Sequence, residues 1–219
     1  MKRIFCYILA IGAIITGAAC SVVNEAIKSG DPQYAYEQAL ELYENGKWDQ
    51  ASTLFEACRH IYMGTPREDS LSFYNARCKF MDHDWEEAAS QLDTYRRKFS
   101  RSPFIEEAEG MYALCHYYMS PPPEYDQTMT TQAIIAITEF MSRYPDSPYT
   151  EQMMYYTTIS AYRLAENSVE SKQLDRYLAM LDNYYSFIAE YPESKHVREL
   201  ERLAKSARNF LDKKANTEM

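Results

Sequence analysis

The heptapeptide RYPDSPY fills residues 143–149, in a chain that otherwise has the pattern of helices. Close variants stand upstream as KFSRSPF at residues 98–104 and downstream as EYPESKH at residues 190–196. In each copy an aromatic residue ends an amphipathic run, and the serine three positions later stands where a helix N-cap is expected. In two copies a proline (Pro145 or Pro192) follows the aromatic residue and stops the helix, and in two a proline (Pro103 or Pro148) follows the serine and fits the first turn of the next helix. Each copy therefore predicts the end of one helix, a turn and the start of another.

The phrase recurs after 45 and then 47 residues, a period typical of solenoids built from stacked helical pairs. The chain has 219 residues with only 6 glycines and 9 prolines, and its apolar residues follow the helical period. Repeat period and composition together predict an all-α fold.

A second repeated pattern begins at Gly46, in the segment GKWDQASTLFEAC. It places a glycine at a helix end, a tryptophan at the turn, and small residues where two helices approach around a phenylalanine. The pattern returns 37 residues later, with Trp85, Ala88 and Leu92 in the places of Trp48, Ala51 and Phe55. This spacing resembles the second half of a tetratricopeptide repeat (TPR), which implies a TPR-like helical-hairpin solenoid.

Four helical pairs can be assigned from this register. The third pair has Gly110 at its small position and is split by a proline-rich insert at residues 120–128, and the fourth runs over residues 149–191. The segment VRELERLAKSARNFLDKK then predicts a C-terminal capping helix. We expect the solenoid to span residues 32–214 and to be followed by a flexible tail at residues 215–219.

The N-terminus has the features of an export signal. Lys2 and Arg3 precede a short apolar run, and small residues lead up to Cys20. Residues 1–19 therefore predict a lipoprotein signal peptide, with Cys20 as the lipidated residue and residues 20–31 as a tether. The alternative is ordinary signal cleavage nearby, with Cys20 as an unmodified thiol.

Charge and motifs exclude several classes of function. The chain carries 32 acidic against 23 basic residues, a formal charge of −9, which speaks against a nucleic-acid partner. No metalloprotease, nucleophile-elbow or phosphate-loop motif is present, and the four histidines are dispersed. We therefore expect neither catalysis nor a cofactor or metal.

Three cysteines besides Cys20 remain after signal removal: Cys58, Cys78 and Cys115. Each lies on an apolar helix face, which favours buried packing residues. A disulfide between Cys58 and Cys78 is the alternative, because export leads to an oxidising compartment.

The 20 tyrosines suggest interaction surfaces. The tyrosine pairs at residues 117–118, 155–156 and 184–185 each predict one ring in the core and one toward solvent or a groove. By register, the groove-facing candidates on the first pairs of helices are Tyr36, Leu40, Tyr43, Phe73, Arg77 and Phe80. Such rings suit peptide binding, but ordinary packing between repeats explains them equally well.

The final helix combines an apolar stripe with basic residues that are unusual in an acidic chain. Its partner-docking candidates are Arg198, Arg202, Lys205 and Arg208. They would steer an acidic partner surface, unless they simply suit the C-terminal end of a capping helix.

Taken together, the lipoprotein cysteine and the segments KSGDPQYAYEQALELYENGKWDQASTLFE, PPPEYDQTMTTQAI, RYPDSPY and LDNYYSFIAEYPESK resemble the BamD family of outer-membrane β-barrel assembly lipoproteins. The resemblance implies a non-catalytic protein anchored in the outer membrane and facing the periplasm. It also implies docking of the C-terminal half onto a BamA-like barrel protein. It implies two further kinds of partner. These are other assembly lipoproteins, and nascent outer-membrane proteins that the N-terminal half would engage.

One helix pair of the family pattern is missing between RYPDSPY and the tyrosine-rich pair, which puts the docking surface in doubt. Only Cys20 transfers from the family. The rival interpretation is a general periplasmic TPR scaffold in cell-envelope organisation. A carbohydrate-binding lipoprotein with TPR helices would need a larger ligand domain than this chain has room for.

Overall fold

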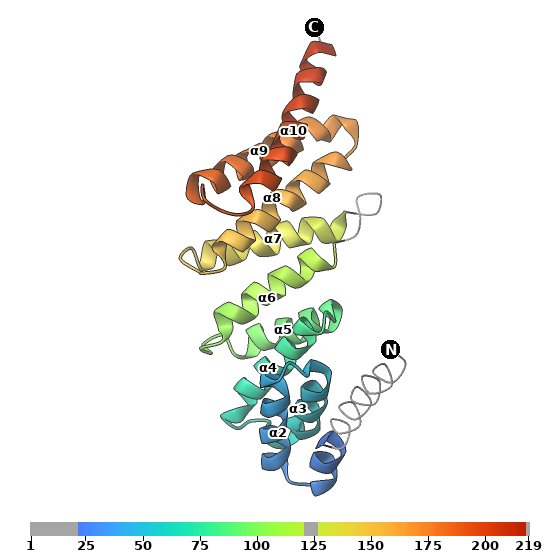
Figure 1. Cartoon of the computed structure of the whole chain (residues 1–219), viewed down its shortest axis with the longest axis vertical. Helices are drawn as coiled ribbons and strands as arrows, with labels where there is room; N and C mark the ends of the chain where they lie inside the picture. Colours follow the sequence, from blue (N-terminus) through green and yellow to red (C-terminus); the bar gives the residue numbers. More distant parts are fainter. Residues whose placement is uncertain (1–21, 121–126, 218–219) are drawn as a thin grey trace, which may run out of the picture. The chain divides into compact units, whose positions relative to one another are not determined.

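The computed structural model describes residues 22–120 and 127–217, and every regular element in them is a helix (Figure 1). Residues 22–29 are helical. The later helices are α2 (Pro32–Glu44), α3 (Trp48–Tyr62), α4 (Arg67–Met81), α5 (Trp85–Lys98), α6 (Ile105–Tyr118), α7 (Thr128–Arg143), α8 (Thr150–Glu166), α9 (Glu170–Glu190) and α10 (Val197–Thr217). The predicted architecture of four helical pairs and a final helix is confirmed.

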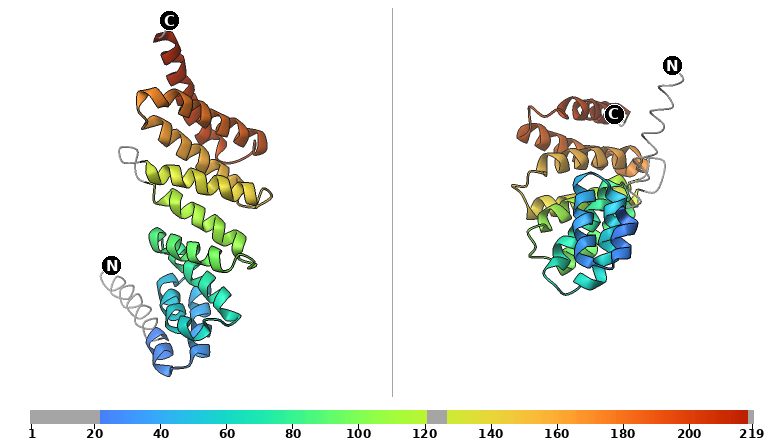
Figure 2. Two further views of the ribbon diagram at one scale, coloured as in Figure 1. Left: turned by 180° about the vertical axis from the view of Figure 1, so that it is seen from behind. Right: turned by 60° about the horizontal axis from the view of Figure 1, so that its bottom comes forward.

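The chain forms two compact units, Met1–Ala108 and Glu109–Met219. In the first unit α3 packs against α2 and α4, and α4 packs against α5. In the second unit α8 packs against α7 and α9, and α10 covers parts of both α8 and α9 (Figure 2). Contact between successive helices is the packing of a TPR-like solenoid.

The alanines that recur between the two copies of the tetratricopeptide-like pattern, and the phenylalanine or leucine four positions after each, lie in the core, as the register predicts. Ala51 and Phe55 of α3, and Ala88 and Leu92 of α5, are fully buried. Gly46 adopts a φ of +70°, which suits glycine, and lets the Lys47 N–H donate back to the carbonyl of Leu42 at 2.8 Å. The two tryptophans of the pattern, Trp48 and Trp85, are only partly buried, so they cover the turns rather than fill the core.

The three copies of the phrase form the same hydrogen-bonded turn. In each, the serine N–H donates to the carbonyl of the aromatic residue three positions earlier, at 2.9–3.2 Å. The serine Oγ then accepts the N–H two residues later, at 3.1–3.3 Å. The helices begin at Ile105, Thr150 and Val197, three residues after the serines. The serines therefore hold a turn that precedes each helix. They were expected at the N-cap position, but each lies one turn before it, so that expectation is wrong.

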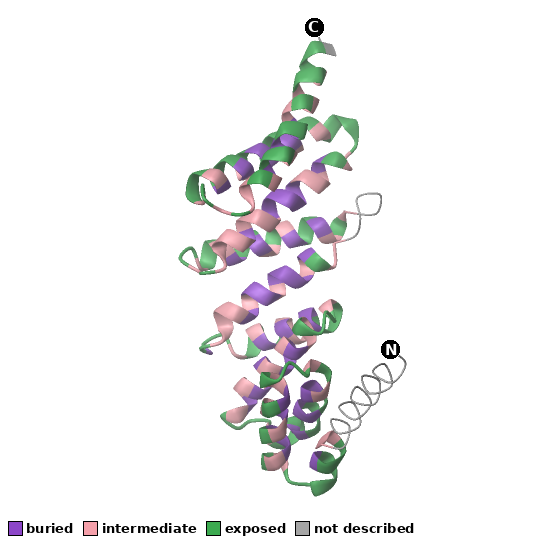
Figure 3. Cartoon of the chain, in the orientation of Figure 1, coloured by how far each residue is buried: buried purple, intermediate pink, exposed green. Residues whose placement is uncertain are grey.

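The core of the second unit depends on a close approach at Gly110. A Cβ at this position would lie 3.3 Å from the ring of Phe140 and 3.6 Å from Met153. Both neighbours are buried, so the small residue lets α6 approach α7 and α8. Buried residues run along the inner side of each helix (Figure 3).

Two predicted boundaries differ from the structure. Residues 22–29, assigned to the tether, are helical, and Ala26 is buried against the core around α2 and α3. The predicted tail begins at residue 215, but α10 continues to Thr217. Residues 1–19, Cys20 and most of the proline-rich insert lie outside the described residues.

Candidate functional site

The first candidate surface is the set of groove residues in the first unit. Two of its six members are core residues. Phe73 is 1% exposed and stacks on Phe104 with ring centroids 4.5 Å apart. Tyr36 is 8% exposed, packs edge-on against Phe55 and places its hydroxyl 3.2 Å from Ser70 Oγ. Neither ring is accessible to a peptide, because packing within the repeats covers both.

The other four candidates are partly exposed. Arg77 bonds the Tyr43 hydroxyl and forms an ion pair with Glu107 at 3.0 Å, so its guanidinium is held in place. Burial raises the pKa of Tyr43, and the nearby Arg77 opposes that rise. Leu40 packs against the core at its edge, and Phe80 lies edge-on to Trp85 at 5.2 Å. A peptide groove formed by Leu40, Tyr43, Arg77 and Phe80 remains a prediction.

A tyrosine cluster joins three helices of the second unit. Tyr117 of α6 lies 4.0 Å from Tyr156 of α8, measured between ring centroids. Tyr155 of α8 stacks on His196, the residue before α10, at 3.8 Å, and donates a 2.8 Å hydrogen bond to Glu199. Burial raises the pKa of Tyr155 far above its usual value, and the hydrogen bond to Glu199 adds to the rise. The Tyr155 hydroxyl is therefore a neutral hydrogen-bond donor at physiological pH.

The tyrosine pairs follow the prediction in two cases of three. Tyr117 is 9% exposed beside Tyr118 at 36%, and Tyr184 is 6% exposed beside Tyr185 at 49%. The pair at residues 155–156 departs from the prediction, because both rings are partly buried between helices.

The sequence analysis missed His196 as a member of the tyrosine cluster. Its signal was present in the repeated phrase, since an aromatic or imidazole ring follows each serine by two positions: Phe104, Tyr149 and His196. Phe104 stacks on Phe73 of the preceding α4 as His196 stacks on Tyr155 of the preceding α8. The ring after the turn thus packs on the previous repeat in both cases.

The basic residues of α10 form the second candidate surface. Arg198, Arg202 and Lys205 succeed one another at spacings of four and three, so they share one helix face. All three are exposed, and no hydrogen bond or ion pair holds them within the described part of the chain. The opposite face buries Leu200, Ala204 and Ala207 in the core.

Arg208 differs from these three. Its guanidinium donates to the Tyr185 hydroxyl at 3.2 Å and lies over the ring of Tyr184 at 6.0 Å. We therefore define the α10 basic face as Arg198, Arg202 and Lys205 alone. Arg198 lies in the first turn of α10, near the positive end of its dipole. Helix stability does not favour cations there, so capping does not explain the face.

The cysteines at positions 58, 78 and 115 are buried free thiols, so no disulfide joins Cys58 to Cys78. Burial raises the pKa of Cys58 to about 11 and that of Cys78 and Cys115 to about 12. They act as small packing residues.

Two other features are absent from the described residues. No group of three or more His, Cys, Asp or Glu residues there is arranged to hold a metal ion. No helix there has the length and apolarity needed to cross a bilayer.

Comparison with known proteins agrees with the resemblance read from the sequence. Residues 28–155 and 124–218 match the model of the YfiO family, described as outer membrane lipoproteins. The chain is 25% identical over 160 residues to outer membrane protein assembly factor BamD of Caulobacter vibrioides, a match that covers 68% of this chain and 52% of the relative. The chain thus spans about half the length of the curated relative it matches. Because the family matches together cover most of the chain, from residue 28 to residue 218, the chain belongs to the YfiO family of outer membrane lipoproteins.

Proposed function

We propose that this protein is a non-catalytic scaffold of the machinery that assembles β-barrel proteins in the outer membrane. It is anchored through lipid on Cys20 and faces the periplasm. Its second unit docks onto the periplasmic domains of a BamA-like barrel protein, alongside other assembly lipoproteins. Family membership and the name of the Caulobacter relative support this role.

The α10 basic face is the observation that carries the docking proposal. Three unpaired cations stand together on a chain whose formal charge is −9. They lie opposite the buried stripe, and Arg198 stands in the first turn of the helix, where the dipole does not favour a cation. An acidic partner surface would gain both steering and attraction from such a face, and its binding would weaken with salt.

Recovery of the barrel partner from detergent-solubilised envelopes tests this proposal. We expect wild type to recover a BamA-like protein and the Arg198/Arg202/Lys205→Glu variant to lose it while remaining folded by circular dichroism. The matched control reverses three exposed basic residues of the first unit, Lys47, Arg59 and Arg101, and so makes the same change in net charge. Equal loss in both variants would mean that net charge matters and the α10 basic face does not. Failure of wild type to recover the barrel protein would favour a general periplasmic TPR scaffold.

The anchor has a separate test. Replacing Cys20 by alanine removes the acceptor of the acyl chains, each buried CH₂ of which contributes roughly 0.8 kcal/mol to membrane binding. We expect the Cys20→Ala chain to leave the membrane fraction with its helical content unchanged. Retention in the membrane would mean that a protein partner or another surface holds it there.

Nascent barrel proteins are the proposed ligands of the first unit. Leu40, Tyr43, Arg77 and Phe80 combine partly exposed apolar area with a guanidinium already fixed by Glu107. A Leu40→Asp/Phe80→Asp variant should bind an unfolded barrel polypeptide more weakly in a fluorescence titration, and Thr53→Asp/Thr94→Asp, on exposed faces of α3 and α5, is its control. Unchanged affinity in the first variant would remove this surface from the proposal.

A further inference from the structure

An apolar stripe runs along the exposed side of α9. Leu174 is 38% exposed, Leu178 46% and Tyr185 49%. With the buried Leu181 and the partly buried Ile188 they succeed one another at spacings of 4, 3, 4 and 3 residues. This is the spacing by which one helix presents a seam to another helix. We call these five residues the α9 seam.

The α9 seam is a departure from the other repeats. When the final aromatic residues Phe99, Tyr144 and Tyr191 are aligned, the inward positions agree: Tyr95, Phe140 and Phe187 are all buried. The outward positions do not agree. Leu178 and Tyr185 correspond to Glu86 and Asp93 of α5, and to Thr131 and Thr138 of α7. The position of Leu174 falls at Asp82 and Gln127, before either of those helices begins. At these two positions the polar residues of α5 and α7 give way to exposed apolar ones on α9, and of the four polar residues Glu86, Thr131 and Thr138 are exposed while Asp93 is partly buried.

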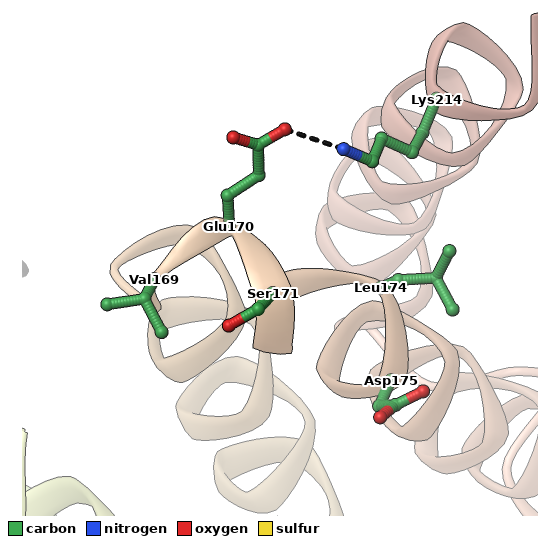
Figure 4. A pocket seen from close by; sticks show the side chains of 6 residues that line it. All are labelled: Val169, Glu170, Ser171, Leu174, Asp175 and Lys214. Atoms are coloured by element: carbon green, nitrogen blue, oxygen red, sulfur yellow. Dashed lines mark hydrogen bonds and ion pairs between the residues drawn. The ribbon is translucent and has the colours of Figure 1, made fainter. Parts of the chain in front are cut away.

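The α9 seam lies beside α10, and we call the strip of surface that the two helices share the trough. The Arg208 guanidinium of α10 reaches the Tyr185 hydroxyl at one end of the seam. At the other end Lys214 of α10 pairs with Glu170 of α9 (Figure 4). Leu174 and Asp175 line an open depression of about 660 Å³ beneath this ion pair. A guest helix would therefore contact α9 and α10 together.

The edges of the trough carry opposite charges. Tyr177 and Tyr184 mark the flank of α9 that faces α10, because they contact Phe210 and Arg208. Asp175 and Asp182 lie on the other flank, exposed and without an ion pair in the described chain. One edge is therefore acidic, and the edge formed by Arg208 is basic.

We propose that the trough binds an amphipathic helix from a partner protein. That helix would carry apolar residues at heptad spacing over about two heptads, and lysine or arginine along the edge that meets Asp175 and Asp182. A second copy of this chain is a poorer occupant, because a seam of two heptads is shorter than the three to four that sustain a coiled coil by themselves. A partner helix laid in the trough would instead be held by two helices at once, as the second helix of a fifth pair.

The inference rests on the proposed function in one respect, because it names the kind of segment that the docking region of the second unit takes. A photoreactive p-benzoylphenylalanine in place of Leu178, in the full lipidated chain in cells, tests it directly. Ile135 is the control position, since it is 52% exposed on α7 outside the trough. We expect cross-linking to one partner protein from residue 178 at least about tenfold above that from residue 135, mapped by mass spectrometry to a helix with heptad-spaced apolar residues. Adding Asp175→Lys/Asp182→Lys should reduce the product about tenfold.

Several results would overturn the inference: cross-links to a second copy of the chain, to lipid, or at no more than the level of the control. The cross-linking experiment can contradict this inference and the proposed function independently of each other. A cross-linked helix from a protein outside barrel assembly would keep the inference and remove the proposed function. Recovery of the barrel protein by wild type, with no cross-link from residue 178, would do the reverse.

Discussion

The same turn is closed differently in the two units. Ser102 of the first unit and Ser147 of the second make matching backbone hydrogen bonds. Ser102 is also buried, where its Oγ accepts from the Tyr95 hydroxyl at 2.6 Å and donates to Asp69 at 2.9 Å. Ser147 is only partly buried and bonds nearby backbone. The local sequence thus determines the turn, while the neighbouring helices determine how firmly it is held.

The outer faces of the helices differ in the same way. At Asp93 the outer face of α5 carries an ion pair to Arg96 at 2.9 Å, whereas the matching position of α9 is the exposed ring of Tyr185. The inward residues of both helices are equally buried. The inner residues of these two helices are thus alike in burial, and the two helices differ on their outer faces.

The largest expected effect is the loss of stability when one buried phenylalanine is truncated in the core of either unit. Phe55 of α3 and Phe187 of α9 are each fully buried. We expect Phe55→Ala and Phe187→Ala to lower the free energy of unfolding by about 3–5 kcal/mol each, the usual cost of removing a buried aromatic ring. Urea unfolding followed by circular dichroism measures this, and a loss below about 1 kcal/mol in either variant would contradict the assigned register.

A smaller effect should separate the two turns. Ser102→Ala removes one partner each from the buried Tyr95 hydroxyl and from Asp69, which keep their hydrogen bond to each other, so we expect a loss of about 1–1.5 kcal/mol. Ser147→Ala removes a side-chain acceptor at the surface and should cost less than about 1 kcal/mol. Equal losses in the same unfolding assay would show that the polar network of the first unit adds nothing to the turn.

The effect that is smallest at neutral pH comes from the buried thiols, which both units contain, because it develops only at alkaline pH. Burial raises the pKa of Cys58 to about 11 and that of Cys115 to about 12, from 9.0 in the unfolded chain. A raised pKa in the folded state means that stability is intact below pH 9 and declines as the pH rises toward 11 and 12. The decline should be weaker in a Cys58→Ala/Cys78→Ala/Cys115→Ala variant. The same slope in both proteins would indicate that other groups cause it.

Much of the fold follows from the sequence because its determinants are local. The serine turns, the small residues at positions 51, 76 and 88, and Gly110 each act on the next helix along the chain, so periodicity reveals them. Exposure is harder to predict. Trp48 lies at the turn where the pattern places it but is only partly buried, and the helical register alone does not show how far its neighbours cover it.

The candidate surfaces could also be predicted where nearby residues determine them, and not where distant residues determine their exposure. The α10 basic face could be predicted, because three cations at helical spacing on one amphipathic helix must share its outer side. The groove set could be predicted only in part, because Phe73 is covered by Phe104, which lies in the turn before α6 and 31 positions away in the sequence. The α9 seam was missed because its apolar residues resembled core residues until their exposure was known.

The most direct test of the whole account is a binding titration with the purified periplasmic domains of the barrel partner. The Cys20→Ala chain is compared with the α10 basic-face variant and with the Lys47/Arg59/Arg101→Glu control, at low and moderate salt. We expect the α10 basic-face variant to bind at least about tenfold more weakly than the Cys20→Ala chain, with an affinity that depends less on salt concentration. The first-unit control should bind with the affinity of the Cys20→Ala chain. Unchanged affinity in the α10 variant, or a greater loss in the first-unit control, would contradict it.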